Sequence, residues 1–267
     1  MKAAQLFDVT GKVALVTGGA AGIGRAYAEV MAANGADVVL LDRDAARLDG
    51  AVGTLRTMGR RIEGIPVDVA DRAALRTAID DALRLMGRLD VVFANAGVAA
   101  GPGFLTLGGK RNAEGALDGI PDALWDTVIA TNLTSVVTTI AAVTPHMKER
   151  RDGRIIVTAS IAGLRPGPIV GSPYLIAKAA VLHLVKQAAL ELVRYGVLVN
   201  AIVPGPFLTD LTTPELKTIF EAGSPMHRVA DVDEVKGLAL FLASPASSYV
   251  TGAHLVIDGG ASLGRAD

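Results

Sequence analysis

Cysteine is absent from this chain of 267 residues. Its absence excludes a disulfide framework and catalysis by a thiolate. Histidine is scarce as well. The chain has 4, at positions 146, 183, 227 and 254, and this spacing is too wide to suggest a zinc-ligand pair. We therefore expect a fold that is held together by packing alone and contains no metal site.

The chain also lacks an excess of charge of either sign. Its 26 Lys and Arg residues are balanced by 27 Asp and Glu residues, for a net charge of −1. This balance argues against nucleic acid as a partner. Aromatic residues make up only 4%, but hydrophobic residues as a whole reach 51% and charged residues only 20%. Such a composition excludes a disordered chain and indicates an aliphatic core.

No segment of the sequence predicts a membrane span or a secretory signal. Residues 91–109 carry no charge over nearly the length of a spanning helix, but they include Asn95, Pro102 and several glycines. A strand followed by a loop fits this stretch better. The first residues, MKAAQLFDVTGK, have no apolar core of the kind that signal peptides need. We expect a cytoplasmic protein with no membrane partner.

Short apolar runs alternate with longer amphipathic stretches along the whole chain. The expected strands are 12–17, 37–42, 61–67, 89–94, 153–159, 196–203 and 253–257, and the expected helices are 22–34, 44–58, 71–86, 121–150 and 172–195. Apolar strands between helices predict a parallel sheet of about seven strands with helices on both faces. No linker or repeat interrupts residues 1–267, so we expect a single α/β domain.

Two of the expected helices, 121–150 and 172–195, carry long apolar faces. Residues such as Ile129, Val136 and Ile140 recur at helical spacing in the first, and Leu182, Val185 and Leu192 do so in the second. Apolar surface beyond what one sheet face covers favours an oligomer built on these helices. The pattern alone fits ordinary core helices equally well.

The first expected strand runs into the turn TGGAAGIG at 17–24, and then into a helix. Small residues there let backbone N–H groups and the helix N-terminus face a diphosphate. The candidate cofactor-binding residues of this turn are Gly18, Ala21, Gly22, Ile23 and Gly24. Tyr27 stands where the third glycine of a strict G-x-G-x-x-G pattern would fall, and no P-loop lysine follows. A purely structural turn would explain the glycines as well.

Acidic residues follow the next two expected strands. Asp42 ends the second strand, where a carboxylate can accept hydrogen bonds from both ribose hydroxyls of NAD and repel the 2′-phosphate of NADP. Arg43 would soften that preference. Asp42 could instead be the N-cap of helix 44–58. Asp68 and Val69 follow the third strand and could bracket the adenine, or Asp68 could be only a turn residue.

With these pieces in order, residues 11–260 resemble the short-chain dehydrogenase/reductase family, whose members have a Rossmann-type sheet. The matching motifs are the 17–24 turn, Asp42, Asp68-Val69, Asn95-Ala96-Gly97, Asn132, Ser160, Tyr174 to Lys178, Pro204-Gly205, Thr209 and Val256 to Gly260.

The Tyr174 to Lys178 stretch carries chemistry that the residues themselves suggest. Tyr174 and Lys178 are four positions apart at the start of a helix, so they share a face. A nearby ammonium, together with the positive nicotinamide of NAD⁺, would stabilise the phenolate and make Tyr174 a general base. Ser160 follows a strand, at the sheet edge where ligands bind, and its hydroxyl could hold the substrate oxygen. The resemblance implies the same three roles.

The resemblance also implies several further roles. Lys178 would hold the nicotinamide ribose, and Asn132 would kink its helix and hold a proton-relay water. Asn95, Ala96 and Gly97 would lie along the adenosine, although Asn95 could mainly brace strands. Pro204, Gly205, Phe207 and Thr209 would contact the nicotinamide and phosphate. The resemblance further implies a substrate site at Ser160, Ala162, Tyr174 and Phe207, a lid at 206–228, and a homotetramer.

The sequence departs from the family pattern in two places. Residues 98–120 form an insertion rich in glycine, which would line the substrate pocket, make a subunit contact or be decorative. Ser160 and Tyr174 are 14 positions apart, one more than is common in the family. If Ser160 were displaced, Thr158 or Ser172 would be the substitutes.

The sequence therefore predicts an NAD-dependent alcohol dehydrogenase or carbonyl reductase that acts on a small secondary alcohol or ketone. Two other functions compete with it. One is an NADPH-dependent 3-oxoacyl-thioester reductase, which Asp42 disfavours. The other is a non-catalytic NAD-binding protein, which the intact Ser160, Tyr174 and Lys178 set disfavours.

Overall fold

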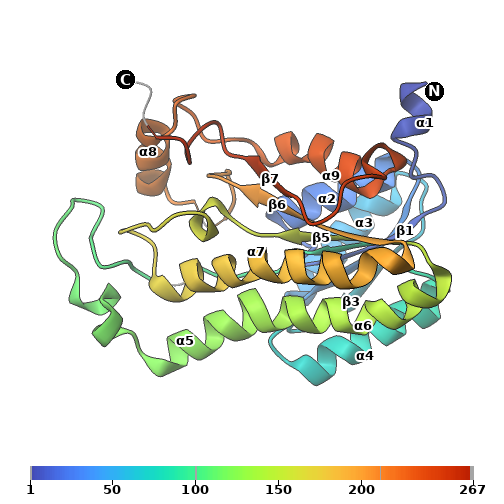
Figure 1. Cartoon of the computed structure of the whole chain (residues 1–267), viewed down its shortest axis with the longest axis horizontal. Coiled ribbons are helices and arrows are strands. Elements are labelled where there is room, and N and C mark those ends of the chain that lie inside the picture. Colours follow the sequence, from blue (N-terminus) through green and yellow to red (C-terminus); the bar gives the residue numbers. More distant parts are fainter. Residues whose placement is uncertain (1, 100, 211, 265–267) are drawn as a thin grey trace.

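The computed structural model describes residues 2–99, 101–210 and 212–264. All seven expected strands are present and form one parallel sheet (Figure 1). They are β1 Val13–Thr17, β2 Asp37–Asp42, β3 Ile62–Pro66, β4 Val91–Ala94, β5 Gly153–Thr158, β6 Val197–Pro204 and β7 His254–Ile257. Their order in the sheet is β3-β2-β1-β4-β5-β6-β7, which confirms the doubly wound Rossmann-type architecture.

The chain reverses direction across the sheet between β1 and β4. It first builds outward from β1 to β3, and then returns to place β4 on the other side of β1. Ala14 accordingly pairs with Val38 of β2 and with Val91 of β4. In sheets of this kind, ligands bind outside the carboxyl ends of the strands at such a switch point. The turn after β1 and the residues after β4 both lie there.

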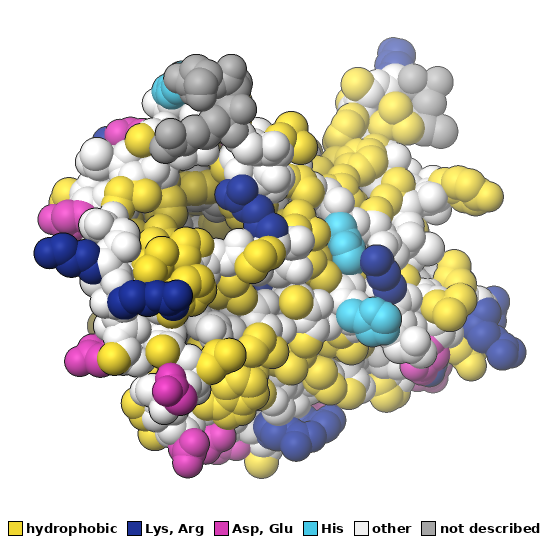
Figure 2. Space-filling view, turned by 60° about the vertical axis from the view of Figure 1, so that its left-hand side comes forward, with side chains coloured by type: hydrophobic (Ala, Val, Ile, Leu, Met, Phe, Trp, Pro, Cys, Tyr) yellow, Lys and Arg dark blue, Asp and Glu magenta, His cyan; other side chains and the backbone are white. Residues whose placement is uncertain are grey.

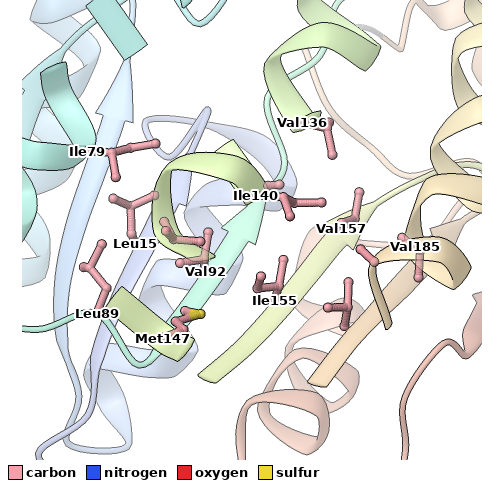
Figure 3. Packing of buried hydrophobic residues seen from close by; sticks show 14 of the residues in the cluster. Leu15, Ile79, Leu89, Val92, Val136, Ile140, Met147, Ile155, Val157 and Val185 are labelled. Atoms are coloured by element: carbon pink, nitrogen blue, oxygen red, sulfur yellow. The ribbon is translucent and has the colours of Figure 1, made fainter. Parts of the chain in front are cut away.

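Helices cover both faces of the sheet, as expected for strands that are buried on both sides. The α-helices are α1 Ala3–Leu6, α2 Gly22–Ala33, α3 Ala45–Arg56, α4 Arg72–Met86, α5 Asp122–Ile129, α6 Ser135–Arg150, α7 Ser172–Leu192, α8 Pro214–Gly223 and α9 Lys236–Ala243. On one face, side chains of α4, α6 and α7 pack on the strands, as Ile79, Ile140 and Val185 do in Figure 3. On the other face, α2, α3 and α9 form a second core.

The long helix expected over 121–150 is continuous but not uniform. It consists of α5, a π-helical turn at Ala130–Thr134 and α6. Among the described residues, this is the one helix long and apolar enough to cross a membrane by length and composition, and half of its most apolar window is buried in the fold. It packs against α4 and α7 in this structure.

Helix α9 is the main element that the hydrophobic pattern did not predict. It is short, but Ala239, Leu242 and Ala243 complete the second core. A capping signal precedes it. The Asp231 side chain accepts from the Asp233 amide, and the Glu234 carboxylate accepts in turn from the Asp231 amide. This Asp-x-x-Glu spacing is a recognised helix-start pattern and could have revealed the helix.

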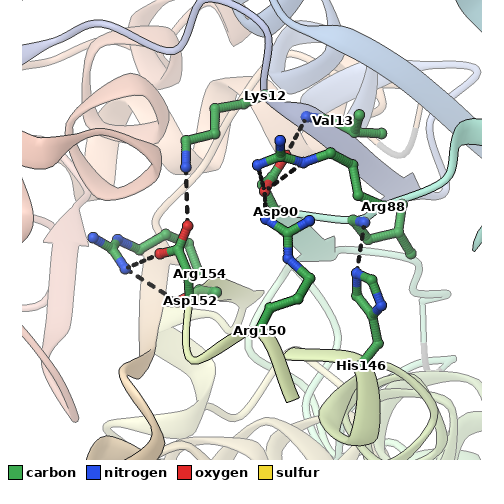
Figure 4. Close-up of polar contacts among 10 residues, drawn as sticks. Lys12, Val13, Arg88, Asp90, His146, Arg150, Asp152 and Arg154 are labelled. Atoms are coloured by element: carbon green, nitrogen blue, oxygen red, sulfur yellow. Dashed lines mark hydrogen bonds and ion pairs between the residues drawn. The ribbon is translucent and has the colours of Figure 1, made fainter. Parts of the chain in front are cut away.

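The amino-terminal edge of the sheet is held by a buried carboxylate. The side chain of Asp90 is 1% exposed, and its Oδ2 accepts from the Val13 amide at 2.8 Å. Its Oδ1 accepts from Arg88 Nε at 3.0 Å and from Arg150 Nη2 at 2.9 Å (Figure 4). Asp90 thus connects β1, the start of β4 and the end of α6. This cluster lies opposite the edge where ligands bind.

We predict that Asp90→Ala lowers the free energy of unfolding by about 3 kcal/mol, because it leaves two guanidinium groups and a buried amide without their partner. The matched control is Glu191→Ala, which removes an exposed pair with Lys148 (N–O distance 3.2 Å) and should cost less than about 1 kcal/mol. Urea unfolding followed by circular dichroism measures both. Equal losses in the two variants would contradict the structural role of Asp90.

Candidate active site

The turn after β1 is shaped by glycines that leave no room for side chains. Gly18 and Gly22 have φ of +64° and +54°, which favours glycine at both positions. A Cβ on Gly24 would lie 2.1 Å from the Gly18 carbonyl oxygen. The N-cap position of α2 is Ala21, which has no polar side chain to satisfy the first N–H groups of the helix. The turn therefore presents backbone donors at the switch point, which suits a diphosphate.

Asp42 is oriented toward this turn by two backbone hydrogen bonds. Its Oδ2 accepts from the Ala20 amide and its Oδ1 from the Asp44 amide, both at 3.1 Å. Asp44, not Asp42, is the N-cap of α3, because it accepts from the Arg47 amide. The alternative role of Asp42 as a helix cap is therefore wrong, and its carboxylate remains at the edge where a ribose would lie.

A cavity of about 610 Å³ opens beside the turn, lined by Ala20 to Gly22, by α3 and by Asp210. Two arginines line it, and both are paired with carboxylates. Arg25 Nε lies 2.9 Å from Glu29, and Arg47 pairs with Asp210 and Asp44. Arg43 is exposed. The positive charges around the cavity are thus largely balanced by the protein itself.

Asn95 connects three strands at the switch point. Its Nδ2 donates to the carbonyls of Thr17 at 3.1 Å and Gly18 at 3.3 Å. Its Oδ1 accepts from Thr158 Oγ1 at 3.0 Å, at the end of β5. The Ala96 amide donates to Thr17 Oγ1 at 3.1 Å. Asn95 therefore braces strands, which is one of the two roles expected for it, the other being a contact with the adenosine. It also fixes the start of the glycine-rich turn.

Asn132 lies within the π-helical turn and is fully buried. Its Nδ2 donates to the Val98 carbonyl at 3.1 Å, and its Oδ1 accepts from the Val98 amide at 3.2 Å. A Cβ on Gly97 would lie 2.7 Å from Asn132 Oδ1 and 3.8 Å from Lys178 Nζ. The expected helix irregularity is present at Asn132, and the residue adjoins both the segment after β4 and the lysine.

The structure brings Ser160, Tyr174 and Lys178 together at the carboxyl edge. The Lys178 Nζ is buried, donates to the Thr158 carbonyl at 2.8 Å and lies 5.6 Å from the centroid of the Tyr174 ring. Burial lowers the pKa of Lys178 to about 8. Burial raises the pKa of Tyr174 above its ordinary value, and a hydrogen bond with Ser160 opposes that rise. The extra residue in the 160–174 interval therefore does not separate the two hydroxyls.

The two substitutes considered for Ser160 are less suitable. Thr158 Oγ1 is engaged by Asn95 and lies 3.3 Å from the Tyr27 hydroxyl. Ser172 is the first residue of α7, two positions before Tyr174 on the same helix. The contact of the Tyr27 hydroxyl with Thr158 was not predicted from the sequence. Its ring is fully buried and stacks on Phe93 with centroids 4.6 Å apart, which explains a large residue at the position of a third glycine.

The other expected cofactor residues lie around the same edge with different exposure. Asp68 is exposed and Val69 is buried in the first core. A Cβ on Gly205, which follows Pro204, would lie 2.6 Å from Asp258 Cβ, so the chain passes closely there. Thr209 Cγ2 lies 3.5 Å from the place of a Cβ on Gly22, so Thr209 adjoins the diphosphate turn.

Two expected substrate contacts differ in their surroundings. Phe207 is 5% exposed and packs in the second core, and its carbonyl accepts from Thr212 Oγ1 at 2.7 Å. Its ring is therefore a core side chain. Ala162 is half-buried in the turn after Ser160, and its amide donates to Ser160 Oγ at 3.2 Å. In the described ranges, no three His, Asp or Glu side chains gather as a metal site would require.

Comparisons with known proteins agree with this geometry. A family profile described as enoyl-(acyl carrier protein) reductase matches residues 18–262. The cyclohexanol dehydrogenase of Rhodococcus sp. strain TK6 is 37% identical over 268 residues, covering 94% of this chain and 96% of that protein.

Solved structures agree as well. An NADPH-dependent 3-quinuclidinone reductase from Rhodotorula rubra has a TM-score of 0.87 at 32% identity, covering 98% of this chain and 95% of the other. A 7α-hydroxysteroid dehydrogenase complexed with NADH and 7-oxo glycochenodeoxycholic acid has a TM-score of 0.88 at 30% identity, covering 100% and 99%. The chain therefore belongs to the short-chain dehydrogenase/reductase family, whose members are oxidoreductases that use a nicotinamide cofactor.

Proposed function

We propose that this oxidoreductase is an NAD-dependent dehydrogenase of secondary alcohols, with alicyclic alcohols as the substrate class. The observation that carries the proposal is the placement of Tyr174, whose hydroxyl feels the nearby Ser160 hydroxyl and whose ring centroid lies 5.6 Å from the buried Lys178 Nζ. Three relatives support the substrate class, since their names refer to cyclohexanol, quinuclidinone and a hydroxysteroid, all of which are cyclic. The mostly apolar side chains of the 98–120 and 206–228 segments suit such a substrate.

The residues at the switch point fit a dinucleotide. The glycine-rich turn forms a cradle that side chains at Gly18, Gly22 or Gly24 would fill or strain. In the proposed complex, the uncapped N-terminus of α2 holds the diphosphate, Asp42 the adenosine ribose and Lys178 the other ribose. When bound, NAD⁺ supplies the chemistry of accepting a hydride from the carbinol carbon.

The choice of NAD over NADP rests on charge. The Asp42 carboxylate is fixed by two backbone amides at the edge of the turn, where it would repel a 2′-phosphate. The arginines that line the neighbouring cavity are paired with Glu29, Asp44 and Asp210, so they offer little uncompensated charge to a phosphate. These two features together favour a cofactor without the 2′-phosphate.

The protein's own groups then handle the proton of the alcohol. Ser160 donates a hydrogen bond to the substrate oxygen, which holds that oxygen beside the Tyr174 hydroxyl. Tyr174 takes the proton as general base, and in ketone reduction it returns the proton as general acid. The Lys178 ammonium stabilises the phenolate from a site that excludes water, where the interaction is strong. Asn132 supports a proton path from this group through the segment at Val98.

We further propose that the protein is a cytoplasmic homotetramer. Helices α6 and α7 lie side by side at one face of the molecule (Figure 1). Large hydrophobic side chains on them remain exposed in the single chain, including Val137 at 40% and Leu190 at 76%. A second copy that packs on this face would bury them.

Sedimentation velocity tests the assembly. We expect a particle with about four times the mass of the 27.4 kDa chain, and a lysine at position 190 (Leu190→Lys) should weaken the assembly by placing charge in the interface. A wild-type protein that sediments as a monomer at micromolar concentration contradicts the proposed assembly.

The role of Tyr174 is tested by Tyr174→Phe. We expect kcat for oxidation of cyclohexanol with NAD⁺ to fall by about 100-fold or more, because proton transfer loses its general base. The affinity for NADH, measured by fluorescence, should stay unchanged. Near wild-type turnover in this variant would sink the assignment.

The direction in which kcat/KM of the wild-type enzyme changes with pH follows from the pKa of Tyr174. Burial raises the pKa of Tyr174, so at neutral pH the phenol is largely protonated. Since the phenolate is the base, kcat/KM for alcohol oxidation should rise with pH, and kcat/KM for ketone reduction should fall over the same range.

Asp42→Ala tests the cofactor choice. We expect the ratio of kcat/KM with NAD⁺ to that with NADP⁺ to drop by about tenfold or more, because a charged hydrogen bond and a repulsive carboxylate are lost together. Asp231→Ala is the control, since it removes a helix-capping carboxylate before α9, away from the cavity, and should leave the ratio unchanged. A wild-type preference for NADP⁺ would refute the role of Asp42 and favour the 3-oxoacyl-thioester reductase.

A further inference from the structure

The insertion between β4 and α5 contains a small hairpin. Within residues 98–120, Leu105 forms an antiparallel bridge with Arg111, and the Asn112 amide donates to the Phe104 carbonyl at 2.9 Å. The Asn112 side chain closes the same hairpin by donating from Nδ2 to the Gly103 carbonyl at 3.0 Å. Residues 103–112 are called the insertion hairpin below.

The insertion hairpin is attached to the loop that connects Ser160 to Tyr174. Pro102, just before the hairpin, bridges antiparallel to Val170. The Gly103 amide donates to the Ile169 carbonyl at 3.2 Å, and the Leu105 amide donates to the Pro168 carbonyl at 2.9 Å. The two places where the sequence departs from the family pattern are thus in direct contact with each other.

The insertion leaves no space for a side chain at two of its glycines, Gly103 at the contact with the loop and Gly115 behind it. A Cβ on Gly103 would lie 2.2 Å from the Pro168 carbonyl oxygen, and a Cβ on Gly115 would lie 2.0 Å from the Gly103 carbonyl oxygen. By contrast, a Cβ on Gly108 at the tip of the hairpin would find its nearest neighbour at 3.9 Å. The glycines of the docked part are therefore required by packing, which a decorative loop would not need.

The far end of the same loop packs on the catalytic helix. A Cβ on Gly163 would lie 2.6 Å from the backbone carbonyl of Lys178, so residues 161–163 are pressed against α7. The Ala162 amide donates to Ser160 Oγ. The loop is consequently held at one end by the site itself and at the other by the insertion hairpin.

The insertion hairpin lies at the end of the molecule where α7 begins (Figure 1), and some of its apolar side chains are exposed. Phe104 is 38% exposed and Leu107 47%, and Leu164 in the facing loop is 45% exposed. The Arg111 guanidinium lies 5.7 Å from the Phe104 ring centroid, which holds that ring in place. Figure 2 brings this end forward and shows a hollow with a largely hydrophobic rim.

We propose that the insertion hairpin determines substrate specificity by fixing the 161–171 loop and by forming an apolar wall of the substrate site. This inference rests on the proposed function. A bulky alicyclic alcohol reaches the wall and binds more tightly because of the apolar area it buries there. A small acyclic alcohol reaches only the Ser160 and Tyr174 hydroxyls and gains nothing from the wall.

The test compares Gly103→Ala with Gly108→Ala, which adds the same methyl group to the same hairpin where space is open. Steady-state rates with NAD⁺ are measured for cyclohexanol and 2-butanol, together with NADH affinity and Tm. For Gly103→Ala we expect KM for cyclohexanol to rise and the cyclohexanol to 2-butanol ratio of kcat/KM to fall by about tenfold, because a displacement of about 1 Å at a site can cost about 100-fold. NADH affinity should stay unchanged, and Gly108→Ala should match the wild type.

A second variant keeps the test decisive if Gly103→Ala does not fold. Asn112→Ala removes the side-chain bond that closes the hairpin without adding bulk, and it should lower the same ratio to a smaller extent. An unchanged ratio in a folded variant overturns the inference, and so does a loss of NADH affinity that accounts for the whole effect. A wild-type protein that oxidises neither alcohol, nor any other secondary alcohol, overturns the proposed function instead.

Discussion

The amide side chain of Asn95 is the contact on which the arrangement of the site depends. It is the point where the end of β1, the end of β4 and the end of β5 are joined by side-chain hydrogen bonds. Because Asn95 holds the Gly18 carbonyl, it sets the start of the diphosphate turn. Because it holds Thr158, whose carbonyl accepts from Lys178, it also sets the position of the catalytic cation. The cofactor end and the catalytic end therefore share one rigid base.

Burial changes the pKa values of the two ionisable side chains at this end of the site. Lys178 is buried and Tyr174 is half-buried, and this loss of water moves both pKa values against the charged forms, downward for the lysine and upward for the tyrosine. At neutral pH the Tyr174 phenol is therefore protonated, and the Lys178 side chain holds its proton less firmly than a lysine in water does. In the proposed complex, the positive charge of the nicotinamide would add to that of Lys178 and help to stabilise the Tyr174 phenolate.

The insertion hairpin is an addition to the family fold that leaves the sheet and its cores unchanged. The Rossmann-type sheet is a feature this chain shares with its relatives. Residues 102–112 of this insertion touch the scaffold through backbone contacts at 168–170, and not through the core. Such an addition can vary without disturbing the sheet, because it contributes few residues to either hydrophobic core.

The sequence by itself determined the seven strands and the five long helices, because strand and helix periodicity are local signals. Its short motifs also predicted the site residues that the structure brings together near Ser160 and Tyr174. Helix α9 was not predicted, because it is short and the side of it that is buried depends on its packing against α2. Only the tertiary structure decided that Asp44 caps α3 and leaves Asp42 facing the turn, and that the Phe207 ring belongs to the core. It alone also decided that 103–112 docks on 168–170, since backbone pairing between distant loops leaves no periodic trace in the side chains.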